Sequence, residues 1–334
     1  MLNEKIAPML ARSSGPFDSP EFIYEVKWDG MRCILFADDT QIRLQNRRMN
    51  DVSVRYPEIT ALRKLIKAEN AILDGELVVL SCGKPDFYKL QSRFHLQNQT
   101  KIDWFAAWMP VTFVVFDILY LNGESCLNVP LYRRKEMIEG IIEKSSRMII
   151  SRPFSVSGIK MFEEVCRRDL EGIVAKRCDS PYLIGKRSEN WLKIKAKHLL
   201  ICRIAGLKIK EGISGERIEA LVLAETCGSE LSYCGHVTSG LSDDKISGIK
   251  KKLSNLKSDC PCIANAKRWK SICWVKPELR CKVIYNERTP SGCLRARLIE
   301  GLFNCSFNKF LIHLLRLYIR YFRLIFFEPL FLFF

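Results

Sequence analysis

The sequence from Phe22 to Ala37 reads FIYEVKWDGMRCILFA and predicts two strands joined by a tight turn. Apolar and aromatic residues dominate both halves, and the Asp-Gly pair at 29–30 is typical of a turn between strands. A second turn, DDT at 38–40, leads into QIRLQN at 41–46. We therefore expect a meander of three antiparallel strands, with Lys27 at the end of the first strand, next to the turn.

The segments that follow this meander alternate between helical and extended patterns. Apolar residues at helix-like spacing predict helices, and short apolar runs rich in β-branched and aromatic residues predict buried strands. The helix candidates are 54–68, 133–144 and 159–168, and the strand candidates are 71–80, 111–121, 171–177 and 190–196. This mixture of helices and antiparallel strands predicts an α+β domain that ends near Lys197.

From Leu199 onward the pattern changes to short β-like runs, interrupted by a helix candidate at 242–256. This pattern is typical of a small barrel with one helix, for which the five-stranded oligonucleotide-binding (OB) barrel is the natural candidate. We therefore divide the chain into a first domain at 1–197, a second domain at 198–302 and a tail at 303–334.

The tail at 303–334 differs in composition from the rest of the chain, because Phe, Leu and Ile dominate it. A membrane span needs about 20 apolar residues with few charges. Every such window of the tail includes one of Arg316, Arg320, Arg323 or Glu328, so we expect no transmembrane span. An interfacial amphipathic helix and a read-through or frameshifted tail remain two open interpretations.

The charge and the cysteines indicate the partner and the compartment. Lys and Arg outnumber Asp and Glu by 53 to 37, which gives a formal net charge of +16. A polyanion is the expected partner, although a membrane surface or a ribosome would also attract this charge. The 14 cysteines include no CxxC pair, and the nearest cluster lacks the spacing and the histidine of a zinc site. Without a signal-peptide pattern at the N-terminus, we expect a protein of the reducing cytoplasm.

Charged residues recur near the ends of the predicted strands. A lysine in a strand, such as Lys27, is more often a solvated surface residue than a nucleophile, and a nucleophilic role requires cations and carboxylates close to it. Asp74 and Glu76 in LDGEL and Glu171 in LEGIV lie beside glycine in otherwise apolar runs. Buried carboxylates are costly unless they are paired or bind a metal. Ordinary turn carboxylates are the alternative interpretation of both segments.

Three further lysines follow these carboxylates. Lys176 belongs to a strand candidate, and Lys193 and Lys195 are two residues apart in WLKIK, which places both on one face of a strand. Such a pair could hold phosphate oxygens. It could equally be a solvated strand face.

Six motifs together resemble the nucleotidyltransferase motifs of the ATP-dependent DNA ligases. They are KWDGMR (27–32), NRRMND (46–51), LDGEL (73–77), FVVFDILYLNG (113–123), EGIVAKR (171–177) and WLKIK (191–195). Their order and approximate spacing are those of the family, and the resemblance covers roughly residues 5 to 302. IAPMLA at 6–11 and VKPELRCKVIYNERTPSGCLRARLIEGL at 275–302 are most similar to the ligase domain of bacterial end-joining ligases. The resemblance implies a nucleotidyltransferase (adenylation) domain with antiparallel sheets and flanking helices, followed by an OB-fold domain.

The resemblance also implies a role for each matching residue. Lys27 would be the adenylated nucleophile. Glu25 would lie near the adenine and Phe116 would stack on it, while Arg47 would hold the ribose. Arg32 would contact the nucleotide or the nick phosphate, and Glu76 would serve both the ribose and the metal. Glu171 would bind the catalytic metal, and the α-phosphate would be held by Lys176, Lys193 and Lys195. Ordinary strand core is the alternative interpretation of Phe116.

The cofactors and partners that the resemblance implies are those of a nick-sealing enzyme. ATP would donate AMP, with Mg²⁺ as the metal and Mn²⁺ as a substitute. The substrate would be nicked or broken double-stranded DNA, and the partner would be a Ku-like end-binding protein. The protein would be a monomer and would lie in the bacterial cytoplasm or nucleoid. The family's basic motif at the end of the second domain has its nearest match in TPSGCLRARLIEGL, where Arg288, Arg295 and Arg297 are available. This match is the weakest.

Two other functions remain open at the level of the sequence. An RNA ligase or a GTP-using capping enzyme shares the KxDG nucleophile and a related barrel. A catalytically impaired nick-binding protein would result if the altered C-terminal motif prevented adenylation. Because Lys27, Glu76, Glu171 and the three lysines of the later motifs are all present, we expect an active DNA ligase.

Overall fold

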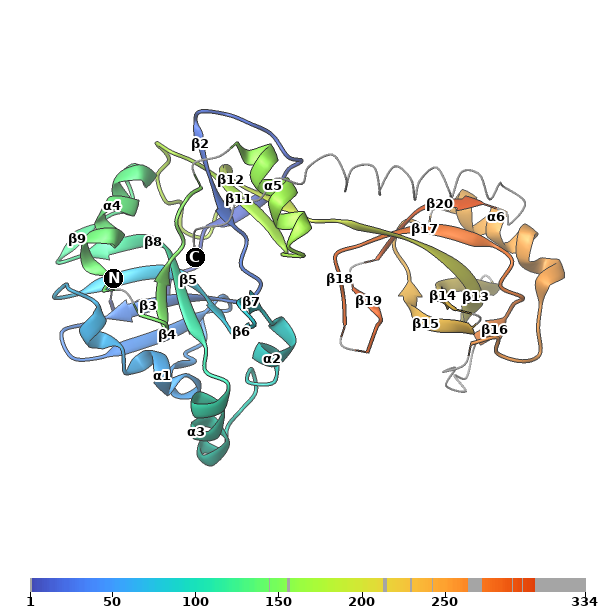
Figure 1. The fold of residues 1–334 in the computed structure, drawn as a ribbon, viewed down its shortest axis with the longest axis horizontal. Coiled ribbons are helices and arrows are strands. Elements are labelled where there is room, and N and C mark those ends of the chain that lie inside the picture. Colours follow the sequence, from blue (N-terminus) through green and yellow to red (C-terminus); the bar gives the residue numbers. More distant parts are fainter. Residues whose placement is uncertain are drawn as a thin grey trace. The chain divides into compact units, whose positions relative to one another are not determined.

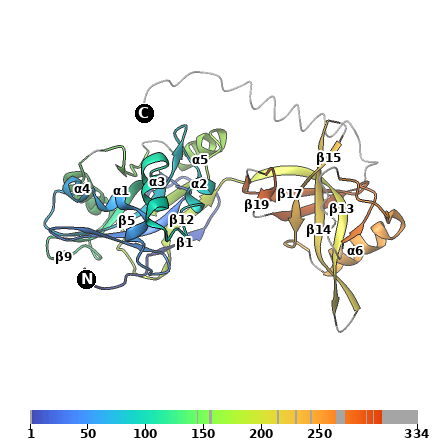
Figure 2. The ribbon, with the colours of Figure 1, turned by 90° about the horizontal axis from the view of Figure 1, so that it is seen from below.

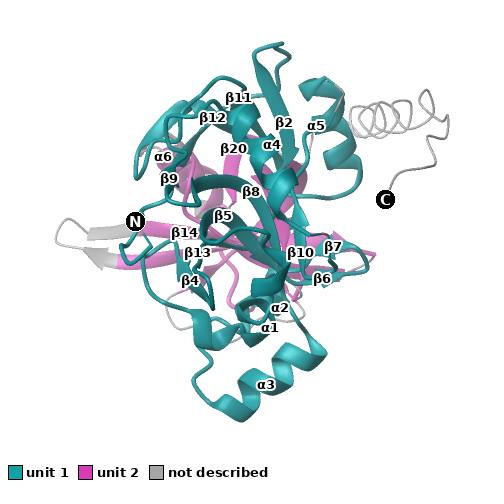
Figure 3. Ribbon diagram, turned by 90° about the vertical axis from the view of Figure 1, so that its left-hand side faces the viewer, with its two compact units in different colours: residues 1–196 teal, residues 197–334 magenta. Residues whose placement is uncertain are grey.

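The computed structural model describes residues 2–143, 145–154, 157–212, 215–228, 230–241, 243–263, 272–289, 291–295 and 297–303. The chain divides into two compact units, residues 1–196 and 197–334 (Figure 3). Apart from Phe303, the tail predicted at 303–334 lies outside the described residues.

The first unit is built on two β-sheets (Figure 1). The four-stranded sheet has the order β1 (Leu10–Ser13), β12 (Arg187–Lys195), β11 (Gly172–Arg177), β2 (Phe22–Val26). The six-stranded sheet has the order β10 (Met148–Ile150), β8 (Thr112–Leu121), β5 (Ala71–Val78), β3 (Met31–Ala37), β4 (Ile42–Asn46), and β9 (Glu124–Ser125) pairs with β8. Two short strands, β6 (Leu80–Ser81) and β7 (Lys84–Pro85), form a separate hairpin.

The predicted three-stranded meander is wrong in one respect. β3 and β4 are antiparallel neighbours as predicted, but β2 belongs to the other sheet and pairs with β11. The turn at 27–30 therefore carries the chain from one sheet to the other. Gly30 allows this crossing, because a Cβ atom at this position would overlap the backbone of Leu77 on β5.

The helices of the first unit are α1 (Pro57–Thr60), α2 (Phe87–Gln91), α3 (Gln99–Trp108), α4 (Leu131–Ile141) and α5 (Gly158–Arg167), with 3₁₀ turns η1 (Ser53–Arg55) and η2 (Arg63–Leu65). The last two predicted helices are confirmed as α4 and α5. The helix predicted at 54–68 is instead the sequence η1, α1, η2. Pro57 restricts the preceding Tyr56 to a non-helical backbone conformation, so a continuous helix cannot pass through it.

Three clusters of buried apolar side chains lie between and beside the layers of this unit. One contains Tyr24 of β2 and Ile173 of β11 with Met161 and Val165 of α5, so α5 covers one face of the four-stranded sheet. The next lies between the sheets, where Ile34 and Phe116 meet Trp191. The third covers the outer face of the six-stranded sheet. The candidate site lies beside the cluster between the sheets.

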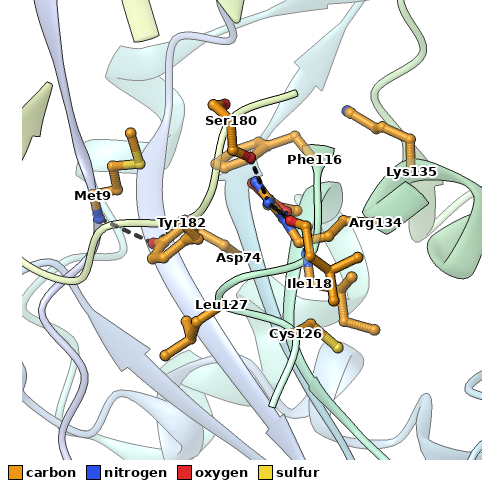
Figure 4. A network of polar contacts seen from close by, with 12 residues as sticks. Met9, Asp74, Phe116, Ile118, Cys126, Leu127, Arg134, Lys135, Ser180 and Tyr182 are labelled. Atoms are coloured by element: carbon orange, nitrogen blue, oxygen red, sulfur yellow. Dashed lines mark hydrogen bonds and ion pairs between the residues drawn. The ribbon is translucent and has the colours of Figure 1, made fainter. Parts of the chain in front are cut away.

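Buried ion pairs fix the elements around the site. Arg134 of α4 and Asp117 of β8 are both fully buried, and the guanidinium donates to both carboxylate oxygens at 2.6 and 3.0 Å. Arg134 also donates to the backbone oxygen of Ser180 at 2.8 Å (Figure 4). Since a buried charge that loses its partner is strongly destabilising, this network holds α4 and the 178–182 loop against β8.

The second unit is a twisted antiparallel sheet with one main helix. The sheet has the order β15 (Glu230–Val237), β14 (Gly215–Cys227), β13 (His198–Gly212), β17 (Arg280–Tyr285), β20 (Leu298–Phe303), and β16 (Ile272–Trp274) pairs with β13. The helix predicted at 242–256 is α6 (Asp243–Leu253; Figure 2) followed by η3 (Ser254–Leu256). Ile249 and Leu253 of α6 are buried in the core of this unit. A small hairpin of β18 (Glu287–Arg288) and β19 (Leu294–Arg295) completes the unit.

Clusters of three or more metal-ligating side chains and membrane-spanning helices are both absent from the described residues. No group of three or more His, Cys, Asp or Glu side chains among them could hold a metal ion. None of the described helices is long and apolar enough to cross a membrane.

Candidate active site

A cavity of about 450 Å³ opens in the first unit where the two sheets meet. Nine of the ten residues that the sequence singled out line it, namely Glu25, Lys27, Arg32, Arg47, Glu76, Phe116, Lys176, Lys193 and Lys195. The tenth, Glu171, contacts two of these nine. Residues 170 positions apart in the sequence are therefore neighbours in space.

Lys27 and Glu171 form the centre of the site. Lys27 follows the last residue of β2, and its backbone N–H donates to the oxygen of Gly172 at 2.9 Å, which joins it to the start of β11. The Nζ of Lys27 lies 2.5 Å from Oε2 of Glu171, and the Nζ of Lys195 lies 2.7 Å from Oε1 of the same residue. One carboxylate therefore holds two of the lysines that line the cavity.

The period of two along β12 explains which side chains reach the cavity. Arg187, Trp191, Lys193 and Lys195 all line it, and they are separated by even numbers of residues. Neighbouring cations and partial burial lower the pKa of Lys193, with burial as the larger cause. This face of the strand presents a row of positive charges, as a phosphate-binding surface requires.

Lys176 lies deeper than the other lysines. It is 2% exposed, and its Nζ lies 3.2 Å from Oε2 of Glu25. Burial lowers the pKa of Lys176 to about 8, although Glu25 acts in the opposite direction. Lys135 of α4 approaches the other oxygen of Glu25 at 2.5 Å. Glu25 is thus a buried carboxylate between two lysines.

Glu76 is the second carboxylate that lines the cavity. Burial raises its pKa from 4.5 to about 8, with smaller raising effects from Glu171 and Asp74 and lowering effects from Lys27 and Arg32. A site that disfavours the charged form of a carboxylate is relieved when a cation enters. The electrostatics therefore favour binding of a cation near Glu76.

Arg32 is held by other protein groups. Its Nε and Nη2 donate to the two oxygens of the buried Asp74, each at 2.5 Å. Tyr182 donates to the same carboxylate at 2.6 Å and accepts from the backbone N–H of Met9 at 3.0 Å (Figure 4). The guanidinium carbon of Arg32 also lies 4.4 Å from the centre of the Phe116 ring. Arg32 lines the cavity, but its Nε and Nη2 already have partners.

Comparison with known proteins places this site in a family. Two family models match the chain, the ATP dependent DNA ligase domain over residues 7–195 and the ATP dependent DNA ligase C terminal region over residues 214–302. The chain belongs to the ATP-dependent DNA ligase family. The matches cover both compact units, so membership rests on most of the described chain and not on the KWDG motif alone.

Two ligases illustrate the similarity in sequence. The chain is 32% identical over 305 residues to the multifunctional non-homologous end joining protein LigD of Mycolicibacterium smegmatis. This match covers 90% of this chain and 38% of that protein. It is 30% identical over 271 residues to a DNA ligase of Thermococcus fumicolans. This match covers 76% of this chain and 48% of that ligase. The chain spans less than half the length of these relatives.

Solved ligase structures show the same architecture. A mycobacterial DNA ligase D complexed with ATP and MES superposes with a TM-score of 0.53 at 29% identity, over 90% of this chain and 95% of that one. The ligase domain of Mycobacterium tuberculosis LigD superposes with a TM-score of 0.52, also at 29% identity, over 89% of this chain and 95% of that one. The predicted fold class, a nucleotidyltransferase domain followed by an OB-fold domain, is confirmed.

The structure adds residues that the sequence interpretation missed. Trp191 lines the cavity and meets Phe116 edge-on with ring centres 6.1 Å apart, and Lys135 holds Glu25. The alternation that selected Lys193 and Lys195 also selects Trp191 and Arg187, so a longer application of the same rule would have found both. Lys135 carries no such signal, because it lies on a helix far from the motifs.

The arginines proposed for the family's C-terminal motif belong to the second unit and are not part of this cavity. Arg288 pairs with Glu225 at 2.8 Å, and Arg295 pairs with Glu287. The guanidinium of Arg297 lies against Gly235. The role of these three arginines toward pyrophosphate stays a prediction.

Proposed function

We propose that this ligase seals nicks in duplex DNA and that Lys27 carries AMP during the reaction. The observation that carries the proposal is the position of Lys27, whose Nζ lies in a cavity between Glu171 and a row of cations. A nucleophilic lysine beside several cations is suited to attack a phosphate, because the cations stabilise the charge that develops on the phosphate oxygens.

The residues around Lys27 divide into three groups by the part of ATP that they would contact. Lys176, Lys193 and Lys195 would hold the α-phosphate, and Arg47, which is exposed at the rim, would hold the ribose. Glu25 and Phe116 would bind the adenine at the buried end of the cavity, where both are almost fully buried. Asp74 holds Arg32 in place, and Arg32 would in turn position the Phe116 ring. Arg32 would contact the nucleotide only through the exposed edge of its guanidinium.

The bonds that change follow from these positions. Nζ of Lys27 attacks the α-phosphorus of ATP, a P–N bond forms, the bond to pyrophosphate breaks, and the lysine loses a proton. The 5′-phosphate of the nick then attacks the AMP phosphorus, the P–N bond breaks and Lys27 regains a proton. Finally the 3′-hydroxyl loses its proton and attacks the activated 5′-phosphate, a phosphodiester forms and AMP leaves. Each step develops charge on phosphate oxygens, so the lysines of β11 and β12 act in all three.

The site also fits a magnesium ion. Glu171 and Glu76 would hold it, since both are confined carboxylates and the charged form of Glu76 is unfavourable without a cation. Mg²⁺ commonly takes only one or two carboxylates from the protein and completes its shell with water and substrate phosphates, which matches the small number of carboxylates here. When bound, the metal neutralises charge on the phosphates. Mn²⁺ would serve as a substitute.

The biological setting that we propose is the repair of broken DNA in a bacterial cytoplasm or nucleoid. The relative from Mycolicibacterium smegmatis is named as a non-homologous end joining protein. We therefore propose double-strand ends as a second substrate, a Ku-like end-binding protein as partner and a monomer as the working form. The domain boundary that we propose, near 197, coincides with the loop between β12 and β13.

The test is covalent labelling with α-³²P-ATP and Mg²⁺, followed by a denaturing gel. We expect the wild-type protein to retain the label and to lose it when nicked duplex is added. Lys27→Ala should not be labelled, whereas Lys64→Ala, which changes an exposed lysine outside the cavity, should behave as wild type. Labelling of Lys27→Ala at the wild-type level would refute the assignment. Labelling with GTP in place of ATP, or discharge by RNA nicks alone, would indicate a capping enzyme or an RNA ligase.

A further inference from the structure

Two tryptophans of α3 are exposed although no step of ligation uses them. Trp104 is 55% exposed and Trp108 is 76% exposed, and their rings stack with centres 6.4 Å apart and an angle of 28°. Positions i and i+4 lie on one face of a helix, so the two rings form a continuous aromatic surface. A contiguous exposed aromatic surface is typical of a binding site.

A second cavity of the first unit, about 430 Å³, lies beside this surface. Trp104, Phe105 and Trp108 form its aromatic wall, and Lys89 and Arg147 contribute the cations of its lining. Lys89 is 47% exposed and bonds to the hydroxyl of Ser81 at 2.7 Å. Within the described part of the chain no carboxylate pairs with Arg147. The lining therefore combines flat aromatic rings with accessible positive charge.

The face of α3 that carries the tryptophans is itself basic. Lys101 is exposed and precedes Trp104 by three residues, which places it on the same face. Asp103, the one acidic residue of α3, accepts a hydrogen bond from Gln99 at 2.8 Å and so is turned along its own helix. Asp86, the nearest acid to Lys89, is 3.5 Å from the lysine nitrogen. The balance of charge around the rings favours an anionic ligand.

The short helix α2 connects this surface with the active site. Phe87, its first residue, lines the cavity that contains Lys27, whereas Lys89, two residues further on, lines the cavity beside the tryptophans. The two cavities thus share one element of five residues. The tryptophan surface and Lys27 therefore belong to cavities that meet the same short helix.

We propose that Trp104 and Trp108 stack unpaired bases of a single-stranded DNA segment next to the break, such as a flap or an overhang, while Lys89, Lys101 and Arg147 contact its phosphates. Aromatic rings combined with cations are the usual means by which proteins bind single strands. Paired bases hide their faces within the duplex stack, so rings that contact DNA by stacking require unpaired bases. The proposal rests on the DNA ligase function above but concerns a site that nick sealing does not require.

The test is binding of a fluorescently labelled single-stranded thymidine 20-mer to the full chain, followed by anisotropy without ATP. Because the alanine variant removes both stacking platforms, we expect Trp104→Ala/Trp108→Ala to bind about tenfold or more weakly. Trp104→Phe/Trp108→Phe, which retains flat rings, should recover most of the affinity. Lys101→Glu/Arg147→Glu should weaken binding and reduce its salt dependence. Tyr132→Ala, which removes a ring that is 46% exposed on α4, is the matched control and should bind as wild type.

Sealing of a nick without unpaired bases separates this proposal from the ligase function. We expect the double alanine variant to seal such a nick at the wild-type rate and to lose activity selectively in joining ends that carry single-stranded overhangs. Alanine favours helix formation and both rings are exposed, so folding should be retained, and the single variant Trp108→Ala provides a second test. Unchanged affinity for the 20-mer in the alanine variants would overturn the proposal. So would a wild-type self-association that requires the tryptophans, because the surface would then bind a second copy of the chain.

Discussion

Arg32 and Arg47 line the same cavity, but the structure gives them different partners. Arg32 donates to both oxygens of Asp74, which is fully buried, whereas Arg47 is exposed and has no protein partner among the described residues. We expect Arg32→Ala to destabilise the protein by about 3–5 kcal/mol, because it leaves a buried carboxylate without its ion pair. Urea unfolding measures this loss.

Arg47→Ala is the matched control for that experiment. It removes the same functional group from the same cavity without exposing a buried charge, so the free energy of unfolding should change by less than about 0.5 kcal/mol. Formation of lysyl-AMP should nevertheless slow by at least about tenfold, since the loss of one charge-assisted hydrogen bond costs about 1.5–3 kcal/mol. Equal stability of the two variants would show that Asp74 finds another partner, and would contradict the structural role given to Arg32.

Glu76 makes stability depend on pH in a predictable direction. Its pKa rises from 4.5 to about 8 on folding, so between these values the native state holds a proton that the unfolded state has released. Stability contributed by this group is therefore complete below pH 4.5 and is lost as the pH rises through 8. Glu76→Gln does not titrate. We expect it to be more stable than wild type at pH 9 by on the order of 5 kcal/mol, and equally stable at pH 4.

Thermal unfolding with EDTA at several pH values measures this difference. Lys176 has a pKa lowered to about 8, and it contributes the opposite slope above that pH, so the difference between variant and wild type is the quantity to follow. Added Mg²⁺ should reduce the advantage of Glu76→Gln, because the wild-type carboxylate then has a cation. A constant difference at all pH values would mean that burial does not control the protonation of Glu76.

At the scale of elements, Gly172 sets the contact between β11 and β12. Its φ is +148°, and a Cβ atom at this position would overlap the backbone of Ile194. Gly172→Ala should therefore separate the strands and displace the adjacent Glu171 from Lys27 and Lys195. We expect a loss of at least about 2 kcal/mol in stability and a large loss of lysyl-AMP formation. Urea unfolding and ATP labelling of the same preparation measure both.

Gly140 provides the opposite case for the same substitution. It lies exposed near the end of α4, and nothing lies within 4 Å of the position of an added Cβ. Alanine has the higher helix propensity, so Gly140→Ala should stabilise the protein by about 0.5–1 kcal/mol and leave labelling unchanged. If Gly172→Ala behaved in the same way, the close approach of the strands at Glu171 would not be needed for the site.

The elements also show what the sequence could and could not predict. The alternation along β12 predicted that Lys193 and Lys195 share a face, because the pleat of a strand has a fixed period. The crossing of the chain between sheets at 27–30 could not be predicted from the same kind of pattern. The local sequence of β2 and β3 is that of a hairpin, and only the distant strand β11, which pairs with β2, makes the difference. Helix α3 was missed because its apolar positions are exposed, with only Ile102 buried, so the usual amphipathic signal is absent.

At the scale of the whole molecule, each described core cluster lies inside one of the two units. The clusters around Leu35, Trp191 and Ile173 belong to residues 1–196, and those around Leu223 and Ala224 belong to residues 197–334. Because cooperative unfolding requires a shared core, we expect two transitions in scanning calorimetry rather than one. The cavity that contains Lys27 lies entirely in the first unit.

Nucleotide binding should therefore move only one of these transitions. ATP without a divalent cation, at a hundredfold excess over its dissociation constant, would stabilise the unit that binds it by about 2.7 kcal/mol. We expect the transition of residues 1–196 to rise by several degrees and the other to stay in place. Lys193→Ala, which removes a cation from the cavity but lies outside the core clusters, should reduce the shift. An equal shift of both transitions would mean that the nucleotide couples the two units, and the cavity of the first unit could then not be its complete binding site.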